Sequence, residues 1–292
     1  MPADQVRVPE RASSVIHDIG YQRYTGPRLG RGYSTASLYV HGLRTAFGLG
    51  RSGKSKIFPW AVVGIVTIVA VVVTAIRSQL GRPVLTYLDF AGSVSFLVIL
   101  FCAAVAPELV SRDLRSGVLP LYFSRPLSRD DYALAKLTAL ASAAWLLLAG
   151  PQTIMLLGGV FSVHGPSAVW HEFLDYLPGI ADSAVYATVY SSLSLLVASL
   201  ASRRAIAAAV IVAVFVVTTP VVGVLGVTGS DTVRQLALLA SPSTLVQGLD
   251  SWLFHGSTRV IGDYGPVYAL VTAGLVVACV AAVLTRYRRA AR

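Results

Sequence analysis

The chain has 292 residues, of which 55% are hydrophobic and only 13% are charged, and its formal net charge is +10. A soluble globular domain carries roughly 25% charged residues. This composition therefore argues against a soluble domain and favours burial in a lipid bilayer. The two cysteines, Cys102 and Cys279, lie far apart in apolar runs, which predicts small buried side chains rather than a disulfide framework. No cleavable signal peptide is expected, because the first 56 residues are polar and basic.

The first predicted element is a short amphipathic helix over residues 36–47, within an N-terminal segment of residues 1–56. Its apolar residues recur at helical spacing on one face, opposite Ser37, His41 and Arg44. That apolar face consists of Ala36, Tyr39, Val40, Leu43 and Phe47.

Residues 48–55 have the sequence GLGRSGKS, which matches the phosphate-binding loop G-x-x-x-x-G-K-[ST]. Such a loop needs a buried strand before it and an ordinary helix after it, so that the helix N-terminus faces the phosphates. Here an amphipathic helix precedes the match and an apolar run follows it. We interpret the stretch from Gly48 to Ser55 as a flexible turn, in which Arg51, Lys54 and Lys56 anchor the next helix at the lipid headgroups. No cofactor or metal is expected to bind this chain directly.

Six apolar stretches of about 18 residues or more are candidate transmembrane helices. They cover residues 57–76, 90–107, 137–161, 180–200, 205–228 and 266–285. Gly150-Pro151 in the third stretch and Pro220 in the fifth predict kinks. The expected fold is an all-α membrane protein, with a six-span domain over residues 57–285 and a basic tail over residues 286–292.

The charged residues are divided unequally by these spans. Of the 24 Lys and Arg residues, 20 lie on the side of the two termini, whereas the 14 acids divide seven and seven, which gives +13 on one side and −3 on the other. The positive-inside rule then places both termini in the cytoplasm. The basic balance indicates topology and attraction to anionic lipid. It does not indicate nucleic-acid binding, because no basic recognition helix or zinc-finger spacing occurs.

The densest charge cluster lies between the second and third spans, in PELVSRDLRSGVLPLYFSRPLSRDDYALAKL, residues 107–137. Glu108 and Arg112 at i and i+4 can extend the second span as a helix, which Ser116-Gly117 would end. Ser128 is a predicted N-cap, with Asp130 and Asp131 in the first turn of the next helix. The pattern predicts a helix, a break, a short apolar helix, a turn and a helix. This segment is either a docking surface or a solvated charged loop.

The segment resembles the corresponding loop of permease subunits of ATP-binding-cassette (ABC) transporters of the ABC-2 type. That loop has a Glu at the end of span 2, then Ser-Gly, a Leu-rich stretch, a Pro-Leu-Ser-Arg stretch and a Lys entering span 3. In this sequence these are Glu108, Ser116-Gly117, the stretch from Leu119 to Leu121, the stretch from Arg125 to Arg129, and Lys136. The N-terminal IGYQRYTGPRLGR, residues 19–31, also resembles prokaryotic, actinobacterial-looking members of this family.

The resemblance implies that this loop forms a coupling helix, which seats in a groove of a separate ATPase subunit. ATP and Mg²⁺ would then bind to that ATPase, and two permease copies with two ATPases would form a transporter, most often an exporter, in the plasma membrane. The chain itself would not be catalytic. The residues expected to couple to the ATPase are Glu108, Arg112, Asp113, Arg115, Ser116, Gly117, Leu119, Pro120, Leu121, Arg125, Pro126, Ser128 and Arg129.

A polar stripe on the fourth span either packs against other helices or lines a transport pathway. The candidate pathway residues, from this stripe and from the third and fifth spans, are Gln152, Tyr186, Tyr190, Ser191, Ser194, Thr218 and Thr219. We expect no Asp, Glu, Lys or Arg deep inside a span. Their absence would argue against an ion-coupled secondary transporter and favour a neutral or amphipathic substrate.

Two short helices are predicted in the largest external loop, over residues 232–240 and 242–254, with Ser241-Pro242 starting the second. Its apolar face would consist of Leu245, Leu249, Trp252 and Leu253. The second helix would either cap the exit side of a pathway or lie at the membrane interface with a Trp anchor.

Two other classes of function compete with transport. A membrane sensor or regulatory protein would need no ATPase. An intramembrane hydrolase is disfavoured, because no H-E-x-x-H or G-x-S-x-G motif occurs and His171-Glu172 is expected in an external loop.

Overall fold

The computed structural model describes residues 26, 29–50, 53–110, 122, 127–201, 203–254 and 261–290. Among these residues, helices are the regular structure and no β-strand occurs. The predicted all-α fold is confirmed.

Five helices in this part of the chain are long and apolar enough to cross a membrane. They are α2 (Gly53–Leu80), α7 (Arg129–Ser162), α8 (Pro166–Leu200), α9 (Arg204–Thr228) and α12 (Gly265–Ala290). A sixth span results if α3 (Tyr87–Ser93) and α4 (Ser95–Leu109) are taken together. The chain is thus built as a multi-pass membrane protein.

The second span is bent, a feature that was not predicted for the expected span over residues 90–107. α3 and α4 meet at an angle of 53°. The break lies at Val94, whose N–H bonds to Phe90 O and Gly92 O. Gly92 lies so close to α8 that a Cβ there would be 3.2 Å from the Tyr186 hydroxyl. The backbone therefore turns beside a close contact with α8.

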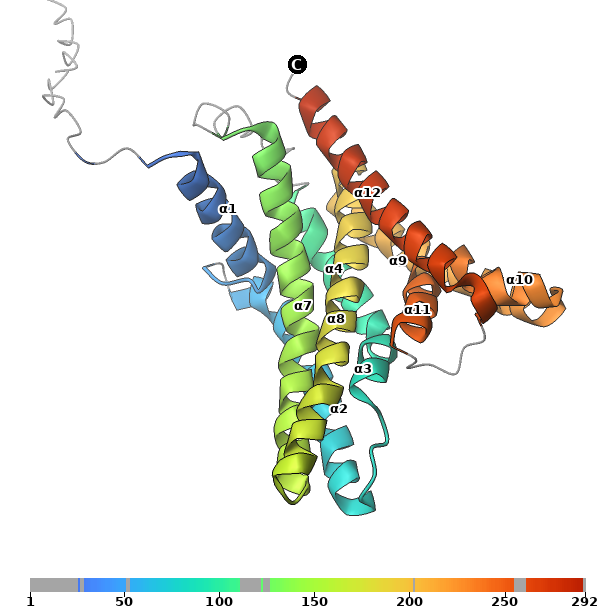
Figure 1. Ribbon diagram of the computed structural model, residues 1–292. Helices are drawn as coiled ribbons and strands as arrows, with labels where there is room; N and C mark the ends of the chain where they lie inside the picture. The colour runs from blue at the N-terminus through green and yellow to red at the C-terminus, as the bar shows by residue number, and fades with distance from the viewer. Residues whose placement is uncertain are drawn as a thin grey trace, which may run out of the picture.

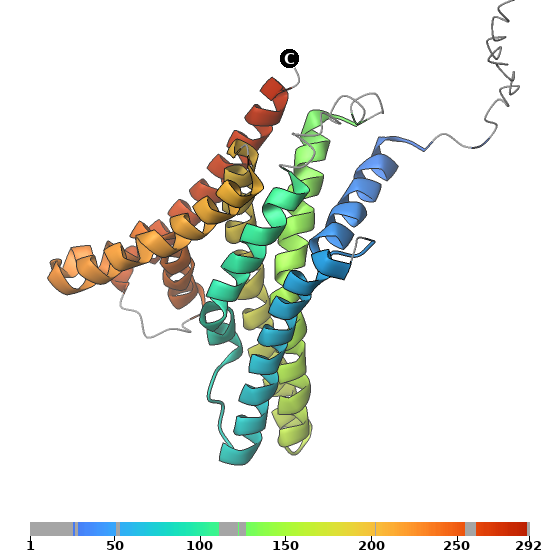
Figure 2. The same ribbon diagram turned by 180° about the vertical axis from the view of Figure 1, so that it is seen from behind.

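The two long helices α7 and α8 run side by side through the whole bundle (Figure 1). α1 (Arg31–Ala46) lies along the first half of α7 and α2 along the second half, as both views show (Figure 2). α1 and α7 begin, and α12 ends, at one end of the bundle. We call this end the basic end, because many of its helix termini carry arginines. The opposite end, where α2 stops and α8 begins, is called the far end.

Between α9 and α12 the chain forms two short helices, as predicted. α10 (Asp231–Leu236) continues into the 3-10 helix η1 (Ala237–Ala240), and α11 (Pro242–Leu253) follows with proline in its first turn. A further 3-10 turn, η2 (Gly262–Tyr264), leads into α12. Leu245 and Leu249 are buried in a small apolar cluster, but Trp252 and Leu253 are exposed, so only part of the predicted apolar face is covered.

α7 begins eight residues before the predicted third span, at Arg129. The predicted N-cap is confirmed: Ser128 Oγ accepts from the N–H of Asp131, and the Asp131 carboxylate accepts from the N–H of Ser128, both at 3.1 Å. This reciprocal pair satisfies two N–H groups at the helix start. α7 and α9 continue as helices through Pro151 and Pro220. The expected kinks stay predictions.

The structure corrects the start of the fourth span. α8 begins at Pro166 rather than at residue 180, after Gly165 with a φ of 95°. His171 and Glu172 therefore lie on a helix and not in an external loop. Polar residues suggested a loop, but Glu172 is compensated by a basic residue of α2, which lets this stretch pack as helix.

The buried face of α1 agrees only in part with the prediction. Ala36 and Val40 are exposed, and the buried residues are Leu38, Gly42 and Ala46. A Cβ at Gly42 would lie 2.9 Å from Ala139 Cβ on α7. Close approach of helices selects small residues at the contact. The prediction is confirmed for Tyr39, Leu43 and Phe47, which pack against the core, and wrong for Ala36 and Val40.

Candidate functional site

An ion pair joins α1 to the start of α7 at the basic end. Arg31 donates from Nε to Asp131 Oδ2 at 2.6 Å and from Nη2 to Asp131 Oδ1 at 2.8 Å. A third bond, from Nη2 to Ser128 Oγ, measures 3.2 Å. The hydrogen bond to Asp131 raises the pKa of Arg31 above its ordinary value. A bidentate pair of this kind fixes orientation as well as distance.

The neighbouring aspartate joins α7 to the end of α12. Arg288 donates to both Asp130 oxygens, at 2.9 Å from Nε and 2.6 Å from Nη2. Arg129 Nη1 donates to the Arg288 carbonyl at 2.8 Å. Three consecutive residues of α7 therefore hold α1 on one side and α12 on the other.

Glu108, near the end of α4, forms an ion pair with Arg204 at the start of α9. The chain between α4 and α7 contains residues 111–126, which we call the coupling segment. The contacts above therefore fix both of its flanks, one to α9 and the other to α1 and α12. Glu108, Ser128 and Arg129 are thereby placed at one end of the bundle.

The remaining residues predicted to couple to an ATPase lie outside the described residues. They are Arg112, Asp113, Arg115, Ser116, Gly117, Leu119, Pro120, Leu121, Arg125 and Pro126.

Aromatic rings continue from the coupling segment into the bundle. Tyr122 packs on Tyr132 of α7 with ring centroids 5.5 Å apart, and Tyr132 packs on Tyr287 of α12 at 5.3 Å. Lys136 Nζ lies 5.4 Å from the centroid of the Tyr132 ring. Tyr122 of this segment thus contacts α7 directly and is linked to α12 through Tyr132.

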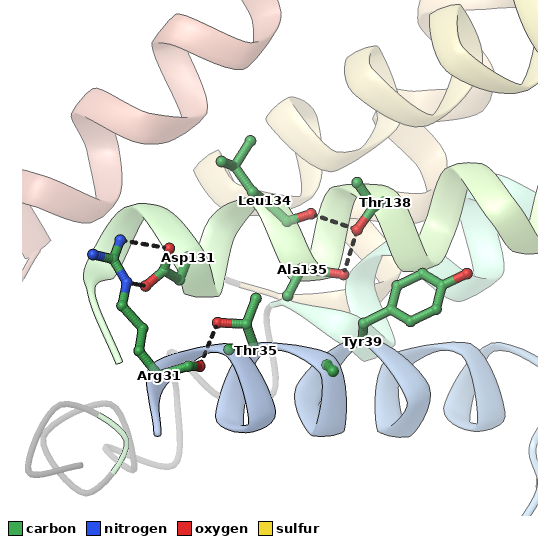
Figure 3. A pocket seen from close by; sticks show the side chains of 9 residues that line it. Arg31, Thr35, Tyr39, Asp131, Leu134, Ala135 and Thr138 are labelled. Atoms are coloured by element: carbon green, nitrogen blue, oxygen red, sulfur yellow. Dashed lines mark hydrogen bonds and ion pairs between the residues drawn. The ribbon is translucent and has the colours of Figure 1, made fainter. Parts of the chain in front are cut away.

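A groove of about 570 Å³ separates α1 from α7 beside the Arg31–Asp131 pair (Figure 3). Thr35, Leu134 and Thr138 line its walls, and Tyr39 lies deeper along α1. α1 meets α7 at the ion pair, at Tyr39, whose hydroxyl donates to Ser142 Oγ at 3.0 Å, and at Gly42.

The candidate pathway residues of α7 and α8 lie inside the bundle of this single chain. Gln152, Tyr186, Tyr190, Ser191 and Ser194 have at most 1% of their surface exposed. The Tyr186 and Tyr190 rings meet edge to face at 5.5 Å, and Gln152 Nε2 donates to the Tyr87 carbonyl at 3.0 Å. Their pathway role stays a prediction, because in this arrangement they form helix contacts.

The two candidate pathway residues on α9 lie elsewhere. Thr218 Oγ1 donates to Ser241 Oγ at 2.8 Å, and Thr219 Oγ1 lies 3.5 Å from Ser243 Oγ. These bonds tie α9 to the start of α11. Thr218 and Thr219 therefore contact the start of α11, whereas Phe215, one turn earlier on α9, packs on Tyr190 of α8.

A buried carboxylate corrects the expectation that no charged residue lies deep inside a span. Asp182 lies near the middle of α8 and is 1% exposed. The predicted fourth span began at residue 180, whereas α8 begins at Pro166. The prediction therefore put Asp182 at the end of the span and not deep inside it. Its neighbours Asp89 and Asp250 were also missed. An Asp inside an otherwise apolar stretch was the available signal.

A second buried carboxylate, also missed, is fully paired at the far end. Arg77 of α2 donates from both terminal nitrogens to Glu172 of α8, each at 2.6 Å, and the Tyr87 hydroxyl of α3 also donates to Glu172. Glu172 thus links α2, α3 and α8. No group of three acidic, histidine or cysteine side chains suited to a metal ion occurs in the described ranges.

The phosphate-loop match lies in a turn between two helices. α1 ends at Ala46, α2 begins at Gly53, and Gly48 and Gly50 adopt φ values of 66° and 80°. A Cβ at Gly48 would lie 2.8 Å from Ser55 O, so the turn folds closely onto the start of α2. Arg51 and Ser52 are outside the described residues. The strand that a phosphate loop follows has no counterpart in residues 29–50, where α1 stands instead.

Comparison with known proteins gives one family for this chain. The model of the family described as "ABC-2 family transporter protein" matches residues 36–291, which is most of the sequence. None of the curated proteins matches the chain significantly. The match includes every helix that could cross a membrane and the coupling segment between α4 and α7. The chain therefore belongs to the ABC-2 family of transporter proteins and is a multi-pass membrane component of an ABC transporter.

Proposed function

We propose that this chain is the permease subunit of an ABC exporter in the plasma membrane, and that a separate ATPase subunit binds and hydrolyses ATP with Mg²⁺. One observation carries the proposal: in a chain of this family, both flanks of the coupling segment are tied by ion pairs to α1, α9 and α12. The basic end faces the cytoplasm, since Lys and Arg gather on the cytoplasmic side of membrane proteins.

The contacts at the basic end suggest how the coupling segment acts. ATP would close the ATPase pair, and the coupling segment, docked on the ATPase, would move with it. Asp131, Asp130 and Glu108 would pass that movement to α1, α12 and α9 through their arginine partners. Two permease copies would enclose the pathway and open it outward. Export is proposed rather than import, because the resembled family consists mostly of exporters.

Affinity purification from gently solubilised native membranes, followed by an ATPase assay, tests this function. The informative variant combines Glu108→Ala with Arg125→Ala. It removes one acid that flanks the coupling segment and one base within the segment. We expect an ATPase to copurify with the wild type, and its ATP turnover to fall in the variant.

A matched variant controls for a general loss of charge. Asp231→Ala with Arg234→Ala also removes one acid and one base, but from an exposed pair of α10 far from the coupling segment. Its ATP turnover should equal that of the wild type. A permease that is isolated alone, with no associated ATP hydrolysis, contradicts the proposed function and favours a membrane sensor.

A further inference from the structure

The Asp182 carboxylate lacks a partner inside the bundle. It is 1% exposed, and its Oδ2 accepts no hydrogen bond from any described residue. Asp250 of α11 is 6% exposed and has an unpaired Oδ1. Glu172 on the same helix is satisfied by Arg77 and Tyr87, so α8 carries one paired and one unpaired buried acid.

The charged groups that act on Asp182 have its own sign. They are Asp250 of α11 and Asp89 of α3, and among the described residues no Lys or Arg acts on it. Burial of an unpaired charge is strongly unfavourable, and an ionisable residue inside a membrane span marks a functional site by default. A positive group from outside the chain would offset this cost.

The surroundings favour an organic cation over a metal ion. The three aspartates do not form a metal-binding group in the part of the chain that the structure describes. Tyr186 and Tyr190 follow Asp182 at successive four-residue steps, so they share its face of α8. The Tyr190 ring lies 4.6 Å from that of Phe215. Aromatic faces attract organic cations and also accommodate apolar groups.

We propose that Asp182, assisted by Asp89 and Asp250, binds the positive group of an amphipathic organic cation that the transporter carries, with Tyr186 and Tyr190 contacting its apolar body. This inference rests on the proposed function, because it assigns a substrate class to the same permease. It replaces the neutral substrate that the sequence favoured, since that preference depended on the absence of a buried charge.

Binding of tetraphenylphosphonium tests the proposal directly. The permease is reconstituted in phosphatidylcholine nanodiscs, whose lipid carries no net charge, and empty nanodiscs give the background. Tetraphenylborate, of nearly the same size and shape but negative, is the matched probe. We expect the wild type to bind the phosphonium and not the borate.

Three variants make the test specific to this carboxylate. Asp182→Asn keeps the shape of the side chain and should weaken phosphonium binding by about ten-fold or more, the effect expected on removing one partner of a buried charge pair. Asp182→Glu keeps the charge and should bind within a few-fold of the wild type. Asp175→Asn removes an exposed carboxylate from the same helix and should leave binding unchanged.

A melting measurement guards against a folding defect. If Asp182→Asn melts at or above the wild-type temperature, its loss of binding reflects the missing charge. If Asp182→Asn melts at a lower temperature, the test depends on Asp182→Glu instead. Retained phosphonium binding by Asp182→Glu then supports the requirement for a negative charge at this position. Equal phosphonium binding by wild type and Asp182→Asn overturns the proposal, as does equal binding of the phosphonium and the borate.

The other possible positive partner of the Asp182 carboxylate is a Lys or Arg of a second permease copy. In that case Asp182→Asn would reduce the dimer fraction in native mass spectrometry and leave phosphonium binding unchanged, which also overturns the proposal. The binding assay needs no ATPase. If the permease binds the phosphonium selectively but no coupled ATP hydrolysis is found, only the proposed function is contradicted. If ATP hydrolysis is coupled but the phosphonium and the borate bind equally, only this inference is contradicted.

Discussion

At the basic end, Arg31 and Arg288 pair with adjacent aspartates while 65% and 60% of their own side chains stay exposed. At the far end, Arg77 pairs with Glu172 while only 20% and 6% of the two side chains are exposed. Exposed pairs contribute little to stability and are screened by salt, whereas removing one partner of a buried pair leaves an uncompensated charge.

The contrast assigns different mechanical roles to the two ends. Exposed ion pairs can exchange partners at small cost, which would suit the helix movement that we propose for the basic end. A buried pair that also accepts from Tyr87 holds α2, α3 and α8 in one arrangement. We therefore expect the bundle to move at the basic end and to pivot about the far end.

The largest effect on stability is expected for Glu172→Gln. This change leaves Arg77 without its counter-charge and should lower the free energy of unfolding by ~2–3 kcal/mol. The loss is expected near or below the lower limit of the range for fully buried ion pairs, because Arg77 is partly exposed. Cys102 and Cys279 are free thiols buried in the fold. A maleimide dye reacts with them when unfolding exposes them, so its reaction during heating reports the melting temperature.

Asp175→Gln is the control for this measurement, because Asp175 is exposed on the same helix. Its melting temperature should match that of the wild type. If Glu172→Gln also melts with the wild type, the far-end pair carries no stability and the proposed contrast between the two ends is wrong.

A smaller loss is expected for Gly179→Ala, at the contact of α8 with α3. The new Cβ would lie 2.9 Å from both the carbonyl carbon and the oxygen of Tyr87, and backbone atoms cannot move aside as a side-chain tip can. Forced overpacking of this kind costs ~1–3 kcal/mol. The same maleimide assay should show a lower melting temperature.

Gly223→Ala on α9 provides the comparison, because nothing lies within 4 Å of a Cβ at that position. Alanine is the better helix former by ~0.5–1 kcal/mol, so this variant should melt at or above the wild-type temperature. Equal losses at Gly179 and Gly223 would mean that the α3–α8 contact is not tightly packed.

The sequence predicted the membrane class and most of the helices because these follow from local properties. The apolar runs and the Ser128 cap depend on neighbouring residues. The structure has a helix over each of the predicted spans 57–76 and 205–228, although α2 is longer than predicted, and it confirms the cap at the start of α7. The two short helices before α12 follow from the Ser241-Pro242 start signal in the same way.

The errors concern residues whose state depends on distant partners. Glu172 looked like part of a loop because its partner Arg77 lies 95 positions away. On α1, Ala36 and Val40 were wrongly placed on the buried face and Gly42 was missed, because the close contact of Gly42 with Ala139 requires a small residue, which apolar spacing does not measure. Asp182 stayed hidden because the boundary of its helix was wrong.

The smallest effect on stability is expected for Arg31→Gln combined with Arg288→Gln, the change that bears most directly on movement at the basic end. The arginines are replaced, rather than their partners, because Asp131 also caps α7 and its removal would disturb that helix. Both arginines are largely exposed, so the melting temperature should barely change. Any small difference should vanish at ~1 M salt, where the Debye length falls to about 3 Å. The ATP turnover of the permease–ATPase complex should nevertheless fall, because the ion pairs that tie α1 and α12 to the flank of the coupling segment are lost. A loss of stability as large as that of Glu172→Gln would show that both ends hold the fold equally, and the bundle would then have no end that is free to move.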